Sequence, residues 1–194
     1  MKNLLKVTII LMSLIFSVSS YAQVNDGDKA ILPFLKKGYR PQIGIAPVAG
    51  LQKTKDIDDL DFVYGVEISL QCPLYQCKKN HIRQQLSIVN TKRDGFSAWA
   101  FELAPHYKLP IASDAEFGVG PHIGYQTNKI TLLDTDFTSG VFTYGLGGSL
   151  DYAFKSIFIG VDARYVWTTK PEYNNIKTES MDNFRTMAKI GFKF

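Results

Sequence analysis

The chain has 194 residues, of which 45% are hydrophobic and 13% aromatic, and it carries 22 Lys or Arg against 18 Asp or Glu. This length suits one domain, and the nearly balanced charge does not favour nucleic acid as a partner. After residue 22, no segment has the uninterrupted apolar length of about 20 residues that a transmembrane helix needs.

The first 22 residues predict a secretory signal peptide. Lys2 and Lys6 flank the start of a 12-residue apolar run, Val7 to Val18, and Ser20-Tyr21-Ala22 forms a small-x-small cleavage site before Gln23. The run is too short to span a bilayer comfortably. Cleavage leaves 20 basic and 18 acidic residues in an exported chain. Residues 23–38 are then expected to form a periplasmic tail, with an interfacial or docking segment as the alternative.

The rest of the chain alternates apolar with polar or small residues, and a period of two indicates strands with two different faces. Each repeat is close to the 9–11 residues with which a strand crosses a membrane. Eight such segments are predicted, at residues 39–51, 62–71, 82–88, 98–109, 115–126, 141–154, 156–167 and 183–194.

The predicted connections alternate in length. Residues 72–80, 110–114 and the neighbourhood of Lys155 give short connections, whereas 52–61, 90–96, 127–140 and 168–182 give longer, more polar ones. Short periplasmic turns and longer extracellular loops are typical of an outer-membrane barrel. With eight strands, both termini are expected on the periplasmic side.

Two features favour a lipid-facing barrel over a soluble β-sandwich. The polar face carries many glycines, which suit the narrow interior of a small barrel. The aromatic residues gather near segment ends and predict two interfacial girdles. One girdle contains Tyr39, Tyr107, Phe117, Tyr152, Phe154, Phe192 and Phe194, and the other contains Trp99, Tyr125, Phe142, Tyr144, Tyr165, Trp167 and Phe184.

The C-terminal segment Met187-Ala-Lys-Ile-Gly-Phe-Lys-Phe194 resembles the terminal strand of outer-membrane β-barrels. Over residues 39–194 the chain is similar in architecture to the small eight-stranded proteins of the OmpA or OmpX type, often called porin-like. The resemblance implies an all-β, antiparallel, up-and-down transmembrane barrel in the outer membrane of a Gram-negative cell. It also implies recognition by the barrel assembly machinery through Phe194.

The alternation predicts a polar network inside the barrel. Its expected members are Arg40, Glu67, Arg83, Glu102, His106, Lys108, Glu116, His122, Asp151, Asp162, Arg164, Arg185 and Lys189. Charges withdrawn from water must pair or stay hydrated, so this set predicts either a salt-bridged plug or a thin ion path. No cofactor is expected.

Cys72 and Cys77 are expected to form a disulfide across a turn, because an exported chain meets an oxidising compartment. A redox or tethering role is the alternative. The pair offers too few ligands for a metal site.

Three functions follow as hypotheses: a structural or surface-interaction barrel, a narrow channel, and an enzyme acting on lipid A. Lipid A deacylases, which this chain is similar to in size, imply a His-x-Ser pair, but His122-Ile123-Gly124 and His106-Tyr107-Lys108 lack the serine. In the predicted loops, residues 53–61 with Asp134 and Asp136 are candidates for a cation or a basic partner. Lys92, Arg93 and Lys170 are candidates for lipopolysaccharide phosphates.

Overall fold

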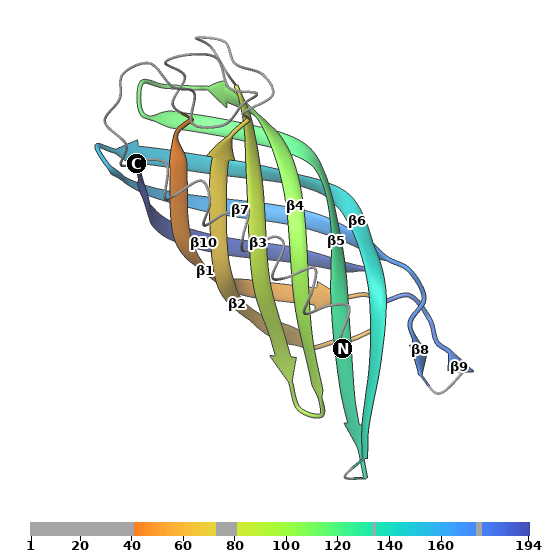
Figure 1. Ribbon diagram of the computed structural model, residues 1–194. Coiled ribbons are helices and arrows are strands. Elements are labelled where there is room, and N and C mark those ends of the chain that lie inside the picture. The colour runs from red at the N-terminus through yellow and green to blue at the C-terminus, as the bar shows by residue number, and fades with distance from the viewer. Residues whose placement is uncertain (1–40, 73–80, 134, 174–175) are drawn as a thin grey trace, which may run out of the picture.

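The computed structural model is a closed antiparallel β-barrel of eight strands, with a small separate hairpin (Figure 1). It describes residues 41–72, 81–133, 135–173 and 176–194. The barrel strands are β1 (Ile43–Thr54), β2 (Leu60–Gln71), β3 (Ile82–Arg93), β4 (Phe96–Pro110), β5 (Ala115–Leu132), β6 (Thr135–Phe154), β7 (Ile157–Thr168) and β10 (Asn183–Lys193). The hairpin is β8 (Glu172–Tyr173) and β9 (Ile176–Lys177). Within these ranges no helix is long and apolar enough to cross a membrane.

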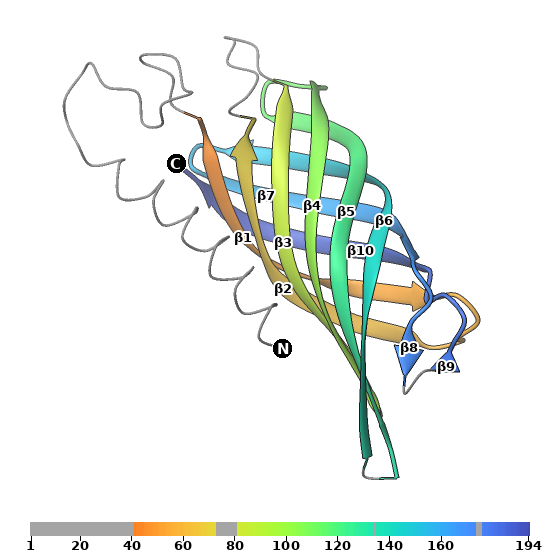
Figure 2. The ribbon, with the colours of Figure 1, turned by 45° about the vertical axis from the view of Figure 1, so that its right-hand side comes forward.

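The barrel closes where β1 pairs with β10, and every other strand pairs with its neighbour in sequence. The C-terminal residue takes part in this closure, because Phe194 N donates to Ile43 O at 2.8 Å and Ile43 N donates to Phe194 O at 3.2 Å. The start of β1 and the C-terminus therefore lie at the same end, which also holds the turns at residues 111–114 and 155–156. The β5–β6 hairpin projects far beyond the opposite end (Figure 2).

The stagger of the strands follows from the pairing register. We start at Thr138 of β6 and step from each residue to its paired residue on the next strand, once round the barrel. The path returns to β6 at Gly148, ten residues further along the chain. The residues passed are Lys129, Ser97, Lys92, Phe62, Leu51, Thr186 and Ala163. For eight strands, this stagger corresponds to a tilt of about 40° from the barrel axis.

The two predicted faces are confirmed. Apolar side chains on the outside are exposed on seven of the eight barrel strands, from Ile45 and Phe62 to Ile190 and Phe192, and on β3 the outward Leu86 and Ile88 are half-buried. The opposite face is buried and largely polar, and it includes Glu67, Glu102 and Arg164. Successive side chains along a strand point to opposite faces, so the period of two in the sequence is enough to assign each residue to a face.

Two of the predicted loops are wrong, because most of their residues lie in strands. Residues 90–96 lie mostly in β3 and β4, which meet in a tight turn at Asp94 and Gly95, where Gly95 has a φ of 69°. Residues 127–140 lie mostly in β5 and β6, which stay paired to Leu132 and Thr135. In these extensions the outward face carries Thr127, Lys129 and Thr131, so the apolar outward face that marks the other predicted strands is missing there. The predicted loop 52–61 is shorter than expected, and 168–182 contains the β8–β9 hairpin.

The β4–β5 ladder is interrupted at two facing prolines. Pairing stops at Leu103 with Ile123 and resumes at Tyr107 with Val119, and this register puts Pro105 opposite Pro121. Proline has no N–H to donate. Gly120 lies against this gap, and a Cβ on it would come within 1.9 Å of the Pro105 carbonyl oxygen.

We therefore expect Gly120→Ala to destabilise the folded barrel by about 1–3 kcal/mol, because backbone must move to admit the methyl group. The matched control is Gly148→Ala, whose Cβ would meet nothing closer than 3.6 Å. Urea unfolding, followed by heat-modifiable gel mobility, measures both. Equal midpoints for the two variants would contradict this account of the gap.

Candidate functional site: a charged network inside the barrel

Arg164 of β7 lies fully buried at the centre of the barrel. Its Nη1 donates to Glu102 Oε2 at 3.0 Å and to Ser87 Oγ at 3.1 Å. Its Nη2 donates to Glu67 Oε2 at 3.2 Å and to Gln85 Oε1 at 3.4 Å. These partners come from β2, β3 and β4, and β3 lies diametrically opposite β7 in the barrel order. The guanidinium therefore spans the lumen.

Arg185 of β10 makes a second connection across the lumen. Its Nη1 donates to Glu102 Oε1 at 2.9 Å, and Glu102 lies on β4, the strand opposite β10. Its Nε donates to Gln52 Oε1 at 3.2 Å. Each oxygen of Glu102 thus binds a different arginine, an arrangement that stabilises the buried carboxylate in its charged form.

Lys189 of β10 lies among three carboxylates. The distances from Nζ are 2.9 Å to Glu67 Oε1, 2.9 Å to Asp162 Oδ2 and 3.2 Å to Asp151 Oδ1. Since Glu67 also accepts from Arg164, the two cations share this carboxylate and belong to one network.

A further branch lies toward the end with the short turns. Lys108 Nζ of β4 forms an ion pair with Asp151 and donates to Ser149 Oγ at 2.6 Å. His106 Nδ1 lies 3.0 Å from the same hydroxyl oxygen. The sequence search for a serine beside a histidine missed this contact, because His106 is on β4 and Ser149 is on β6.

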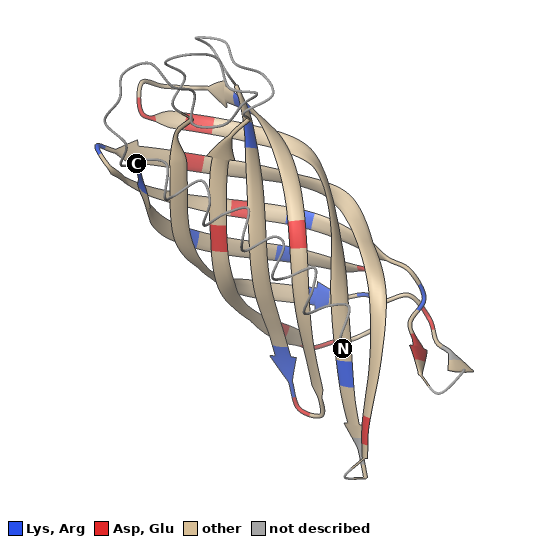
Figure 3. Cartoon of the chain, viewed as in Figure 1, with Lys and Arg blue, Asp and Glu red and all other residues tan. Residues whose placement is uncertain are grey.

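The network is electrically balanced. Four cations, Lys108, Arg164, Arg185 and Lys189, meet four carboxylates, Glu67, Glu102, Asp151 and Asp162. Figure 3 shows acidic and basic residues on the middle parts of several barrel strands. A buried charge that lost its partner would cost several kcal/mol, so the loss of any one member destabilises the folded barrel.

Little space remains around this network. A small cavity, which has room for about one water molecule, is lined by Glu67, Arg83, Glu116, Asp151, Lys189 and Lys193, among others. An apolar cluster of Val48, Val63, Val89, Ala100 and Met187 is buried inside the barrel wall. Side chains therefore occupy most of the described interior around this network.

The other predicted interior residues that the structure describes, namely Arg83, Glu116 and His122, lie beside the network but form no ion pair with its members. His122 is buried, but neither ring nitrogen has a hydrogen-bond partner among the described residues. Arg83 Nη2 donates to Gln42 Oε1 at 2.7 Å, and Glu116 lines the small cavity. Arg40 and Cys77 lie outside the described residues, so the disulfide with Cys72 stays a prediction. No group of three or more metal-ligating side chains occurs within the described ranges.

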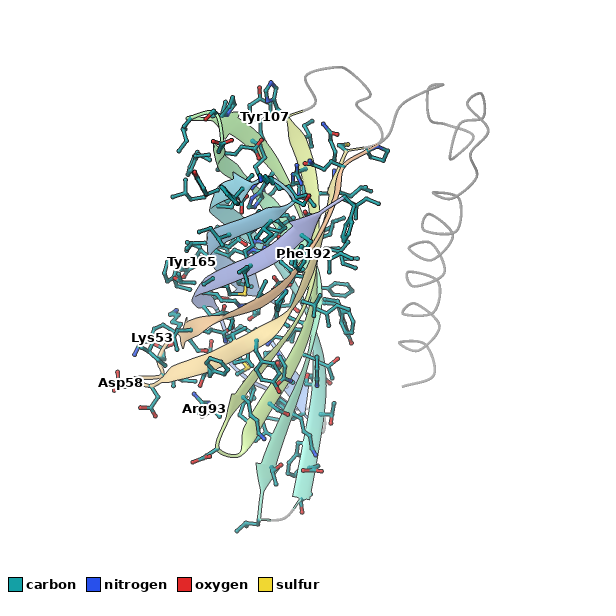
Figure 4. The ribbon with its side chains drawn as sticks, turned by 90° about the vertical axis from the view of Figure 1, so that its left-hand side faces the viewer. Lys53, Asp58, Arg93, Tyr107, Tyr165 and Phe192 are labelled. Atoms are coloured by element: carbon teal, nitrogen blue, oxygen red, sulfur yellow. The ribbon has the colours of Figure 1, made fainter. Side chains whose placement is uncertain are left out.

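The end of the barrel opposite the short turns also carries charged side chains. Arg93 turns inward, 3.6 Å from buried Asp61, and its guanidinium lies over the Phe96 ring. Lys170 pairs with Glu179 at 3.4 Å. Two of the three residues predicted to meet lipopolysaccharide are therefore engaged within the protein. Figure 4 shows Lys53, Asp58 and Arg93 at this end and Tyr107 toward the other.

Lys53, Lys92 and Lys129 at this end are exposed and face outward, and two of them also form exposed ion pairs, Lys53 with Asp58 at 3.9 Å and Lys129 with Asp136 at 2.7 Å. Lys92 pairs in register with Ser97, and Ser97 with Lys129. The two lysines are thus two strand spacings apart, or about 10 Å. Trp99 is exposed two residues further along β4, on the membrane side of this row. The lysines therefore lie just outside the predicted aromatic girdle.

No protein-family model and no curated protein sequence matches this chain. Solved structures do match its fold. Neisserial surface protein A has a TM-score of 0.63 at 13% identity, over 79% of this chain and 97% of that protein. Ail from Yersinia pestis has 0.54 at 12%, over 79% and 97%. The N-terminal β-barrel domain of OprF from Pseudomonas aeruginosa has 0.52 at 15%, over 80% and 100%.

These similarities confirm the predicted fold class and the resemblance to small eight-stranded outer-membrane barrels. The identities are too low to carry a function, a ligand or a site from those proteins to this chain. What the network does must therefore be argued from its own geometry.

We expect Arg164→Met to lower the free energy of unfolding by about 3–5 kcal/mol, because it leaves buried carboxylates without their shared cation. Lys170→Met is the matched control, since its ion pair with Glu179 is exposed and is worth about 1 kcal/mol or less. Urea titration of the refolded protein measures both. An Arg164→Met variant as stable as the control would show that the network does not hold the barrel together.

Proposed function

We propose that this protein is an outer-membrane barrel with a closed lumen, which serves a structural and surface-interaction role in the cell envelope. The observation that carries the proposal is the pair of connections across the lumen that Arg164 and Arg185 make to Glu102. A barrel whose lumen is blocked by side chains can anchor an exposed surface in the membrane without transporting a solute.

The outer surface supports a membrane location. Large apolar side chains are exposed on seven of the eight barrel strands, and such an extensive apolar exterior is stable in lipid and not in water. The projecting β5–β6 hairpin is proposed to be extracellular and the short-turn end periplasmic. Phe194 lies at that second end, which suits recognition by the barrel assembly machinery, and both termini are then periplasmic.

A narrow ion path is the second candidate. Arg164 Nε and Arg185 Nη2 have no hydrogen-bond partner among the described residues, and water molecules at these atoms would favour conduction. A lipid A-modifying enzyme is supported less. Ser149 and His106 are in contact, but both are buried and the described cavity has no room for an acyl chain.

We expect the refolded mature protein to give no discrete conductance steps in planar bilayers, because the paired charges fill the lumen. Heat-modifiable gel mobility must first establish that the inserted protein is folded. Reproducible steps whose size changes in Glu102→Gln would instead support the channel and make the network its conduction path.

Lipopolysaccharide is the proposed lipid partner of the outward lysines. Replacing Lys53, Lys92 and Lys129 by Gln removes three cations next to the membrane interface, and we expect about tenfold weaker lipopolysaccharide binding, equivalent to about 1.4 kcal/mol. Lys155→Gln, in the turn at the opposite end, is the control. Binding to vesicles with and without lipopolysaccharide measures the effect. Undiminished binding by the triple variant would exclude these lysines as the contact.

A further inference from the structure

Strand β3 forms the floor of a shallow groove on the lipid-facing side of the barrel. Its outward Leu86 and Ile88 are half-buried, although Val66, a smaller residue paired in register with Ile88 on β2, is 46% exposed. On the other side, Leu103 of β4 pairs in register with Leu86 and is exposed. The outward side chains of β2 and β4 thus project further from the wall than those of β3, and Figure 2 shows the three strands side by side.

The outer end of this groove is polar. Asn90 of β3 pairs in register with Tyr64 and Trp99, and since both aromatic side chains are exposed, the amide lies between them on the outside of the barrel. Asn90 is only 4% exposed, and its Nδ2 donates to Ala98 O at 3.2 Å. No described residue donates to its Oδ1, which is not enclosed and can accept a hydrogen bond from a ligand.

Lys92 lies beyond Asn90 on the same face of β3. Of the three outward lysines, Lys53 and Lys129 each have a carboxylate partner. Lys92 is exposed and forms no ion pair with any described residue. Its register partner Ser97 on β4 places a hydroxyl beside it. Because the charge of Lys92 is not neutralised within the protein, this lysine attracts an anionic head group more strongly than the other two.

The length of the groove matches one leaflet of a bilayer. Leu86 and Lys92 are six residues apart on β3, or about 20 Å along the strand. At a tilt of about 40°, this is about 15 Å along the membrane normal, which is half of the hydrocarbon core. An acyl chain over Leu86 and Ile88 therefore has its head group at Asn90 and Lys92. This is the leaflet on the side of the β5–β6 hairpin, which is the proposed outer one.

The hydrogen-bonding groups of the groove decide which lipid fits. A diacyl phospholipid joins its chains through esters, which have no hydrogen to donate to Asn90 Oδ1. A phosphorylated glucosamine lipid, the membrane anchor of lipopolysaccharide, has amide N–H groups where its acyl chains join the sugar, and a phosphate on the sugar. The exposed apolar faces of Tyr64 and Trp99 can pack against the C–H groups of that sugar.

We propose that the outward face of β3 binds one phosphorylated glucosamine lipid of the outer leaflet. Its phosphate contacts Lys92 and Ser97, and one of its amide N–H groups donates to Asn90 Oδ1. One acyl chain lies over Ile88 and Leu86, between the side chains of β2 and β4. This inference rests on the proposed contact between lipopolysaccharide and the outward lysines, and it assigns that contact to one lysine and one groove.

The test titrates the refolded mature barrel in neutral detergent micelles with lipid A, and separately with phosphatidylglycerol, whose chains are joined by esters. The fluorescence of Trp99 in a Trp167→Phe background reports binding. We expect saturable binding of one lipid A per barrel, tighter than that of phosphatidylglycerol. Lys92→Gln should weaken lipid A binding at least fivefold, nearly as much as the triple lysine variant, because the phosphate loses its unpaired cation. Lys155→Gln, at the opposite end, is the control.

A second variant tests the amide contact. Asn90→Leu keeps nearly the same size and removes the acceptor. It should weaken lipid A binding at least fivefold and leave phosphatidylglycerol binding within twofold, which separates recognition of the amide from attraction of any phosphate. Heat-modifiable gel mobility establishes that each variant is folded.

Three results would overturn this inference and leave the broader lipopolysaccharide contact standing. The first is parent-like binding by Lys92→Gln when the triple lysine variant is weakened. The second is Asn90→Leu without effect on lipid A, and the third is equal affinity of the parent protein for the two lipids. If the triple lysine variant also binds lipid A like the parent protein, the proposed lipopolysaccharide contact fails together with the inference.

Discussion

A narrow barrel in lipid offers its central charges no bulk water, and the rest of this structure depends on that constraint. Lipid outside the wall requires every backbone group to be paired within it, which a closed ladder achieves. Closure sends every second side chain inward, and the inward charges then have only one another as partners. Arg164 and Arg185 meet this requirement by sharing Glu102 across the lumen, so the same contacts that satisfy the charges also close the barrel.

The sequence predicted the barrel and its two faces because both depend on a period of two, which is visible within a single strand. It predicted that Glu67, Glu102, Arg164 and Arg185 point inward for the same reason. It did not predict which of them meet, because pairing across the lumen depends on the ten-residue stagger of the closed ladder. The contact between His106 and Ser149 was missed for that reason. The length of β5 and β6 was also missed, because the outward face of their extensions is polar, as at Lys129, Thr131 and Thr138.

If the lumen is closed, as proposed, the outside of the barrel carries the function. The wall ends near Trp99, with the outward lysines beyond it, and the β5–β6 hairpin continues further from the membrane. In this account a rigid barrel positions a basic row outside its wall for lipid phosphates.

The central claim is that ion pairs across the lumen hold the barrel closed, and a double-mutant cycle between Arg185 and Glu102 tests it most directly. The cycle compares the free energies of unfolding of Arg185→Met, Glu102→Gln and the double variant with that of the parent protein. The account predicts that the double variant loses clearly less stability than the sum of the two single losses, since each single change leaves a buried charge unpaired. Additive losses would contradict the claim, because they would mean that the two side chains do not interact energetically.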